Sequence, residues 1–365
     1  MSGSPSGAST SPPQAPAQAQ AGPTVVVQGE VSTTFYPVIE ADDFSSSESA
    51  YDANSDLESD TTSLKSSVLN YYYENGRRYH SRSVTNQEYF VPNDEVESDR
   101  LDLTHHVMTI MQKGKLHAAP IGDHPQKIMD IGTGTGIWAI EMADMYPSAI
   151  VIGNDLSPIQ PGWVPPNVQF VVEDIEDDWT YDANTFDLIY CRYLLGSIRN
   201  WPRLVSQAYK ALKPGGYLEI LEPDSHLHSD DNTLPEDSPL MQWNNAFIDA
   251  AEKGVGSIVE APKYKDYIVD AGYVEIHEDV MKLPNSGWPK NKWLKEAGQY
   301  HLPALLDGLE PLSIHLLTTV GGMSLEETQA LFAKARANVK DKSIHTYFNL
   351  HRYVARKPLH AHDTH

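Results

Sequence analysis

The sequence predicts an α/β protein built on a doubly wound, mostly parallel sheet. Between residues 127 and 223, short apolar segments alternate with stretches that have the period of amphipathic helices. The connections are short, and a glycine-rich turn joins the first apolar segment to the first helical one. This alternation is typical of parallel sheets with helices on both faces. Ligands of such proteins bind at the carboxyl ends of the strands.

Five strands and two helices make up this pattern. The strands are expected at residues 127–131, 149–155, 168–174, 185–195 and 216–223, and the helices at 137–146 and 201–212. The second helix is expected to stop at the Lys-Pro-Gly-Gly string that follows it, because proline and glycine end helices. Strand five would then begin behind the two glycines.

Further elements are expected on either side of this core. Apolar residues at helical spacing over 96–111 follow Asn93 and Asp94, which predicts one amphipathic helix with its N-cap at that pair. Residues 273–283 are typical of closing antiparallel strands that follow a helix. A Ser-x-x-Glu string at 324–327 predicts the capped start of a late amphipathic helix.

The first 65 residues are predicted to be a disordered acidic tail. They are rich in Ser, Pro, Gly, Ala, Gln and Asp, and such segments bury too little apolar surface to offset the entropy lost on ordering. A docking or phosphorylation segment is the alternative, because serine beside acidic residues suits acid-directed kinases. We expect one folded domain over 66–365. Its cofactor core would span about 125–225, and its helical cap and C-terminal strands about 226–358.

Charge and composition exclude several classes of protein. The chain has 365 residues with 50 acidic and 27 basic side chains, a formal net charge of −23. Direct nucleic-acid binding is therefore not expected, because it needs clustered Lys and Arg. No apolar stretch approaches the roughly 18 residues of a membrane span. With Cys191 as the single cysteine, the chain is expected in a reducing compartment: the cytoplasm, the nucleus or both.

The glycine-rich turn at residues 132–136 indicates the chemistry of the ligand. Its glycines let the backbone approach a ligand closely, with free N–H groups directed at it. The spacing is G-x-G-x-G, whereas dinucleotide-binding turns have G-x-G-x-x-G. Asp130 stands just before the turn, where a carboxylate repels a pyrophosphate but suits an ammonium group. The pattern therefore favours S-adenosylmethionine over NAD.

Two further acidic residues stand at the ends of predicted strands. Asp155 ends the second strand, where an acid can accept both ribose hydroxyls of a nucleoside. A helix cap in front of Ser157 is the alternative role for this residue. Asp174 ends the third strand, where it can accept an adenine amino proton. Because Asp174 lies in a run of acids, a solvated loop is its alternative.

The motifs together resemble a class I S-adenosylmethionine-dependent methyltransferase. The strings DIGTGTG, FDLIYCRYL and LKPGGYLEI occur in this order, with the acids between them. ENGRRYH, VPNDEVESDRLDLTHH, DLSPIQPGWVPPN, GSIRNWPRL and AGYVEIHEDVMKLP are similar to the fungal LaeA-like methyltransferase family. The resemblance covers about residues 71–358. It implies a seven-stranded Rossmann-like sheet with helical cap insertions.

The resemblance also implies cofactor contacts. Asp130 and the glycine turn would hold the amino-acid end, Asp155 the ribose, and Asp174 with Ile175 the adenine. Cys191 and Arg192 would border the methyl donor. The expected cofactor-binding residues are Asp130, Gly132, Thr133, Gly134, Gly136, Asp155, Asp174, Ile175, Cys191 and Arg192.

The sequence singles out no catalytic residue. Methyl transfer needs an aligned nucleophile and, for a hydroxyl or ammonium acceptor, a general base. Candidates at the strand-end edge are His226, Glu222 and Tyr193. We expect no metal, because the D-x-H-x-H-x-D-D string at 224–231 has no distant partner motif. The thiol at 191 and the tryptophans at 138, 163, 179 and 201 are expected in the core, and lining a substrate pocket is the alternative for the tryptophans.

Three functions remain open. The protein could modify a fungal secondary metabolite, or methylate a protein as a nuclear regulator of secondary metabolism or development. It could also retain the fold as a regulatory protein that works through protein partners. The intact D-x-G-x-G-x-G string argues against a purely structural relative. It leaves a small molecule and a protein both open as the methyl acceptor.

Overall fold

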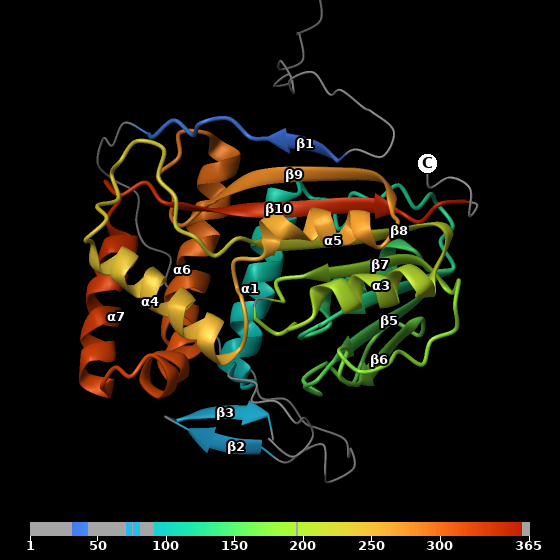
Figure 1. Ribbon diagram of the computed structural model, residues 1–365, viewed down its shortest axis with the longest axis horizontal. Coiled ribbons are helices and arrows are strands. Elements are labelled where there is room, and N and C mark those ends of the chain that lie inside the picture. Colours follow the sequence, from blue (N-terminus) through green and yellow to red (C-terminus); the bar gives the residue numbers. More distant parts are fainter. Residues whose placement is uncertain (1–30, 43–70, 75, 81–90, 195, 360–365) are drawn as a thin grey trace, which may run out of the picture.

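A computed structural model describes residues 31–42, 71–74, 76–80, 91–194 and 196–359. These residues form one eight-stranded sheet, helices packed around it, and a separate two-stranded hairpin (Figure 1). The strand order in the sheet is β1-β9-β10-β8-β7-β4-β5-β6. Most of the predicted acidic tail lies outside the described residues.

The parallel core of the sheet agrees with the predicted strands. It consists of β4 (Lys127–Ile131), β5 (Ile150–Asp155), β6 (Val168–Val172), β7 (Phe186–Arg192) and β8 (Leu212–Pro223). From β4 the chain builds outward in one direction through β5 and β6. It then returns to the other side of β4 with β7 and β8. This reversal places a crevice at the carboxyl ends of β4 and β7, where open α/β sheets bind ligands.

Two later strands close the sheet. β10 (Tyr347–Arg356) lies between β8 and β9 (Val274–Pro284) and is antiparallel to both. β9 follows the short helices η1 (Ala261–Lys263) and α5 (Tyr264–Asp270). The expected antiparallel closure after a helix is therefore confirmed. With it, the seven strands of the predicted architecture are complete.

An eighth strand comes from inside the range predicted as a disordered tail. β1 (Ser32–Phe35) pairs in parallel with β9 and forms the edge of the sheet. The Thr33 hydroxyl donates to Glu278 Oε2 over 2.9 Å, and Ser32 Oγ lies 2.7 Å from His277 Nδ1. The boundary at residue 65 is thus wrong for this segment. Its contacts are with residues about 245 positions away, which no local composition reveals.

Successive residues of the central strands enter two different cores, as the period of two requires. Met129 of β4 and Ile189 of β7 belong to the core covered by α3 (Trp201–Ala211) and α5. Ile128 and Leu188 belong to the core covered by α2 (Ile137–Met145). The helices therefore cover both faces of the sheet, as a doubly wound fold demands.

Several boundaries differ from the predicted ones by one to four residues. β7, for example, ends at Arg192, three residues before the predicted end at 195. β6 ends at Val172, two residues earlier than expected, because the chain turns there and Asp174 accepts from the Glu176 N–H. β8 already begins at Leu212, so the Lys-Pro-Gly-Gly string is strand. This early start follows from the pairing with β7, because Leu212 already lies opposite Phe186. The register between the two strands shifts before Leu188.

Helix α1 (Glu95–Met111) confirms the predicted helix, its cap and the burial of Val107 and Met111, but not the burial of Val96. The Asp94 carboxylate accepts from the Glu97 N–H over 3.0 Å as the N-cap. Val96 was expected on the apolar face and is 58% exposed. Glu97 and Arg100 are buried instead. Buried charges of this kind need partners and often mark a site.

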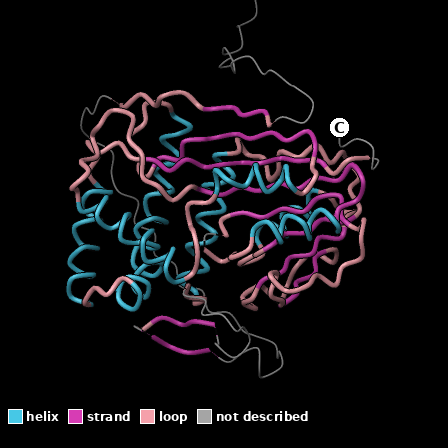
Figure 2. The backbone as a smooth tube through the Cα atoms, in the orientation of Figure 1, coloured by secondary structure: helices cyan, strands magenta, loops and turns pink. Residues whose placement is uncertain are grey.

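A helical cap covers one end of the sheet. It consists of α4 (Pro239–Gly254), α6 (Lys292–His315), the π-helical turn η2 (Leu316–Val320) and α7 (Leu325–Lys340), which share one hydrophobic core (Figures 1 and 2). Ser324 and Glu327 form the predicted capping box of α7. Helix α6 also packs along α1. Within the described ranges, no helix has the length and apolarity that a membrane span requires.

The four tryptophans named above divide between core and surface. Trp138 and Trp201 are buried, and Trp179 is partly buried against the core, as expected. Trp163 is 97% exposed, so the core prediction is wrong for this residue. It belongs to the loop that connects β5 to β6, a segment without a regular element to pack against.

Candidate functional site

One pocket lies at the carboxyl ends of the central strands. Its first wall comes from the turn after β4 and the segments that follow β5, β6 and β7. Its second wall comes from α1, the residues just before it, and Leu312 of α6. The lining residues are Val91, Pro92, Asn93, Glu97, Arg100, Leu101, Ile131, Gly132, Gly134, Asn154, Asp155, Leu156, Ser157, Ile159, Glu173, Asp174, Ile175, Tyr193, Leu194, Ser197, Ile198 and Leu312.

The glycine turn is held by the strand beside it. Gly132 donates its N–H to Asn154 Oδ1 over 3.3 Å, and Gly134 donates to Asp155 Oδ2 over 2.8 Å. Thr133 and Gly136 also donate to carbonyl groups of the protein. These N–H groups are therefore engaged inside the protein, whereas the sequence predicted free groups directed at a ligand. The turn offers a close backbone approach but little hydrogen-bonding capacity for an anion.

Asp155 lies where the prediction placed it, at the end of β5 on the pocket wall. Its Oδ1 accepts from the Ser157 N–H over 2.9 Å, but no helix follows, so helix capping is not its role. Burial raises the pKa of Asp155 to about 6, against the lowering effect of the backbone N–H bonds from Ser157 and Gly134. A carboxylate held in this way can accept hydrogen bonds from a ribose or attract a cation.

Asp174 and Ile175 also line the pocket, beyond the end of β6. Asp174 Oδ1 accepts from the Glu176 N–H over 2.9 Å, which fixes the turn. The residue is only partly exposed, and Ile175 is buried. Asp174 therefore organises its loop and faces the pocket at the same time, so neither of its two predicted roles excludes the other.

Asp130 and Thr133 lie behind the pocket wall. Asp130 is 2% exposed and accepts from the Thr133 hydroxyl over 2.6 Å. Burial raises the pKa of Asp130 to about 7, although the positive charge of Arg192 opposes this rise. Asp130 thus holds the turn from within. Its predicted contact with the cofactor ammonium stays a prediction.

Gly136, Cys191 and Arg192 do not belong to the pocket lining either. A Cβ on Gly136 would lie 2.3 Å from Phe170 Cζ, so this glycine allows the turn to pack on a ring of β6. Cys191 is buried in the core, and burial raises the pKa of its thiol well above the usual value. The thiol is therefore neutral and unsuited to be a nucleophile.

Of the three catalytic candidates, only Tyr193 lines the pocket. Glu222 is buried at the end of β8, where it accepts from the Leu194 N–H over 2.6 Å. His226 is exposed on the loop behind β8. Its neighbour His228 lies 2.9 Å from Asp224 Oδ2. Across the described residues, no three His, Cys, Asp or Glu side chains are arranged to hold a metal ion.

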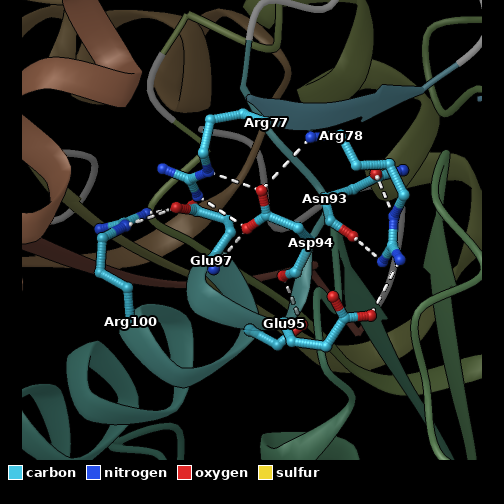
Figure 3. Close-up of polar contacts among 8 residues, drawn as sticks. Arg77, Arg78, Asn93, Asp94, Glu95, Glu97 and Arg100 are labelled. Carbon is cyan, nitrogen blue, oxygen red and sulfur yellow. Dashed lines mark hydrogen bonds and ion pairs between the residues drawn. The ribbon is translucent and has the colours of Figure 1, made fainter. Parts of the chain in front are cut away.

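The second wall contains functional candidates that the sequence reasoning missed. Arg100 donates to both carboxylate oxygens of Glu97, over 2.9 and 2.6 Å, and both side chains are buried on the pocket. Asn93 is 2% exposed on the same wall. Figure 3 shows these residues beside Arg77 and Arg78. A pair of opposite charges at i and i+3 was the signal available in the sequence.

The hairpin of β2 (Tyr71–Glu74) and β3 (Arg77–His80) is fastened to this wall. Arg77 contacts both carboxylate oxygens of Asp94, at 2.5 and 2.7 Å. Arg78 donates to Asn93 Oδ1 over 3.3 Å and to its carbonyl oxygen over 2.5 Å. Bidentate arginine contacts are geometrically specific. The hairpin therefore fixes the entry of the chain into α1.

The pocket fits S-adenosylmethionine in its chemistry. It offers carboxylates to a cationic ligand with a diol and an amino group, and an apolar surface at Ile175 and Ile198. The Ser157 hydroxyl, beside Asp155, is buried and has no hydrogen-bond partner among the described residues. The side-chain N–H₂ of Asn93 is likewise buried without an acceptor in the described part of the chain. Buried polar atoms of this kind are expected to find partners on a ligand.

Comparisons with known proteins agree with this site. The Methyltransferase domain family matches residues 103–278. Methyltransferase pytC of Aspergillus terreus is 43% identical over 83% of this chain and 93% of its own. Secondary metabolism regulator LAE1 of Cochliobolus heterostrophus is 38% identical, over 79% of this chain and 95% of its own.

Further matches have lower sequence identity. Protein-methionine methyltransferase laeA of Emericella nidulans is 35% identical over 79% of this chain and 77% of its own. Among solved structures, a Haemonchus contortus phosphoethanolamine N-methyltransferase 2 with S-adenosyl-L-methionine is 18% identical. It covers 69% of this chain and 52% of that chain, with a TM-score of 0.40. Because its sequence is 35–43% identical to these curated relatives over most of its length, the chain belongs to the LaeA-like family of S-adenosylmethionine-dependent methyltransferases.

Proposed function

We propose that the enzyme transfers a methyl group from S-adenosylmethionine, bound in the strand-end pocket, to an acceptor admitted beside Tyr193. The observation that carries this is the shared lining of one pocket by Gly132, Gly134, Asp155 and Asp174. Asp155 would accept the ribose hydroxyls, and Asp174 with Ile175 would border the adenine. Bound cofactor supplies an electrophilic methyl group on a sulfonium.

The chain's own contribution is to hold, orient and shield the reactants. Asp130 and Thr133 fix the glycine turn from behind, so its backbone can border the amino-acid end of the cofactor. Helix α1, the residues just before it and Leu312 of α6 form the opposite wall and would limit the access of water. Alignment of this kind supplies a large part of the rate in group transfer.

Tyr193 is the residue we place against the methyl acceptor. It follows β7 directly, lines the pocket and has a φ of 55°, a strained conformation for a tyrosine. Strained residues cluster at functional sites. Burial raises the pKa of Tyr193, so its hydroxyl stays protonated near neutral pH. It would therefore orient an acceptor through a hydrogen bond rather than act as a permanent base.

We further propose that this activity serves or regulates fungal secondary metabolism. The support is the name of the relatives, several of which are secondary metabolism regulators. The acceptor is then a small molecule or a protein. The alternative is a regulator that acts through protein partners in a nuclear complex; the word regulator in these names supports a regulatory role in general. Cytoplasm, nucleus or both is the corresponding location.

Methyl transfer into a fractionated fungal lysate tests these proposals. Full-length enzyme and cofactor labelled in the methyl group are added, and the label is scored in protein and small-molecule fractions. We expect label with the wild type and little with Asp155→Ala. Label in the small-molecule fraction would make a metabolite the acceptor. Bound cofactor and captured protein partners, with no label in any fraction, would favour the regulator instead.

A further inference from the structure

The amino-acid end of the proposed cofactor carries a carboxylate, and the turn beside it lacks donors for that group. The N–H groups of Gly132, Thr133, Gly134 and Gly136 all donate to atoms of the protein. Asp155 and Asp174 are acceptors, and they repel an anion. A carboxylate in this pocket therefore needs donors from elsewhere in the lining, and the opposite wall offers one.

Asn93 on that wall has a donor without an acceptor. Its side chain is 2% exposed, lines the pocket, and its Nδ2 has no hydrogen-bond partner in the described ranges. Arg100 is the one basic side chain among the described lining residues, but its charge is compensated by Glu97. A buried N–H without a partner costs free energy, which a bound ligand recovers by supplying an oxygen.

The orientation of the Asn93 amide is fixed by Arg78. An arginine can only donate hydrogen bonds, so the amide atom that faces Arg78 Nε must be the oxygen. The second contact, from Arg78 Nη2 to the Asn93 carbonyl, holds the backbone as well. Because Oδ1 faces the hairpin, Nδ2 is turned away from it. Figure 3 shows this arrangement at the start of α1.

We propose that Asn93 Nδ2 binds the carboxylate of S-adenosylmethionine, with Arg78 as a positioning residue that acts through Asn93. The proposal rests on the cofactor position proposed above. It adds a contact from residues 77–93, which lie before the matched methyltransferase domain at 103–278. The hairpin β2–β3 would then be part of the cofactor site.

The test compares two ligands on the full-length chain. S-Adenosylmethionine and its decarboxylated form differ only in the carboxylate, and calorimetry gives the dissociation constant of each. A hydrogen bond to a charged group predicts that the wild type prefers the carboxylated cofactor by about tenfold or more. Asn93→Leu should lose most of this preference and bind the decarboxylated form within about twofold of the wild type.

Further variants separate positioning from folding. Asn93→Asp keeps an acceptor for Arg78 but loses the donor, and it should reverse the preference. Arg78→Met should reduce the preference, because the amide is then free to rotate. Asn244 is also 2% exposed, but both ends of its amide are hydrogen-bonded away from the pocket. Asn244→Asp should therefore leave the preference unchanged even if it lowers stability.

Two results would overturn the proposal. One is an unchanged preference in folded Asn93→Leu and Asn93→Asp. The other is an equal loss of affinity for both ligands, which would place Asn93 against another part of the cofactor or in the scaffold. Failure of the wild type to bind either ligand is a different result. It would reject the proposed function and this contact together.

Discussion

Two glycines of the same turn should respond differently to alanine. At Gly136, φ is +82° and an added Cβ would lie 2.3 Å from Phe170 Cζ and 2.7 Å from its Cε1. The ring has little room to move, because it also packs closely on the backbone of Gly153. A Cβ added at Gly153 would lie 2.9 Å from the Cδ1 and Cε1 atoms of the ring. At Gly134, φ is +59° and the nearest atom, Leu101 Cδ1, is 3.5 Å away.

These distances give the expected magnitudes. A left-handed backbone costs alanine about 1–2 kcal/mol at either position. Overpacking against the ring adds about 1–3 kcal/mol at Gly136 alone. We therefore expect Gly136→Ala to lower the free energy of unfolding by about 2–5 kcal/mol, and Gly134→Ala by about 1–2 kcal/mol.

Urea unfolding followed by circular dichroism measures this difference through the midpoint and slope of each variant. Cofactor affinity should respond in the opposite order, because only Gly134 lines the pocket. Gly134→Val should abolish cofactor binding while the protein remains folded. Unfolding free energies of the two alanine variants that agree within about 0.5 kcal/mol would refute the steric argument.

Three other outcomes follow from the site. Asp155→Ala should weaken S-adenosylmethionine binding about tenfold or more, seen by calorimetry, since it removes a charged hydrogen-bond acceptor; unchanged affinity would remove Asp155 from the ribose site. Burial raises the pKa of Asp155 to about 6 and that of Asp130 to about 7, so these acids are protonated in acid and ionised above neutrality. Affinity for the cationic cofactor should therefore rise with pH between about 5.5 and 7.5 and then level off, and a flat profile would contradict this assignment. Tyr193→Phe should lower the rate of methyl incorporation about tenfold without changing cofactor affinity, because it removes only a hydrogen bond to the acceptor; an unaltered rate would place the acceptor elsewhere.

Local patterns were sufficient for the parallel core and the first wall of the pocket. Each strand from β4 to β8 is an apolar run that is bounded by turn residues. The glycine turn has the spacing G-x-G-x-G, which distinguishes it from dinucleotide-binding turns. Signals of this kind do not depend on distant partners. For that reason Gly132, Gly134, Asp155 and Asp174 could be placed at the strand ends before the structure was known.

The second wall of the pocket could not be predicted in this way, because it is held by contacts between pairs of polar side chains. The type of a single residue does not reveal such contacts. Glu97 and Arg100 are charged residues that hydrophobicity assigns to the surface, yet each makes the other's burial tolerable. The role of Asn93 depends on Arg78, which reaches it from a hairpin 15 residues earlier. Helix α6 contains Pro303 and Pro311 in its interior. Because proline disfavours the interior of a helix, the sequence of this segment does not predict one. Packing along α1 compensates for them.

The edge strand β1 has a consequence for the order of events on the ribosome. Ser32 pairs with His277, which is synthesised 245 residues later. At about 5–20 residues per second, the interval is roughly 12–50 s. During that time, this edge of the sheet has not yet been made. Among the strands that the structure describes, the one that is translated first must therefore be among the last to dock.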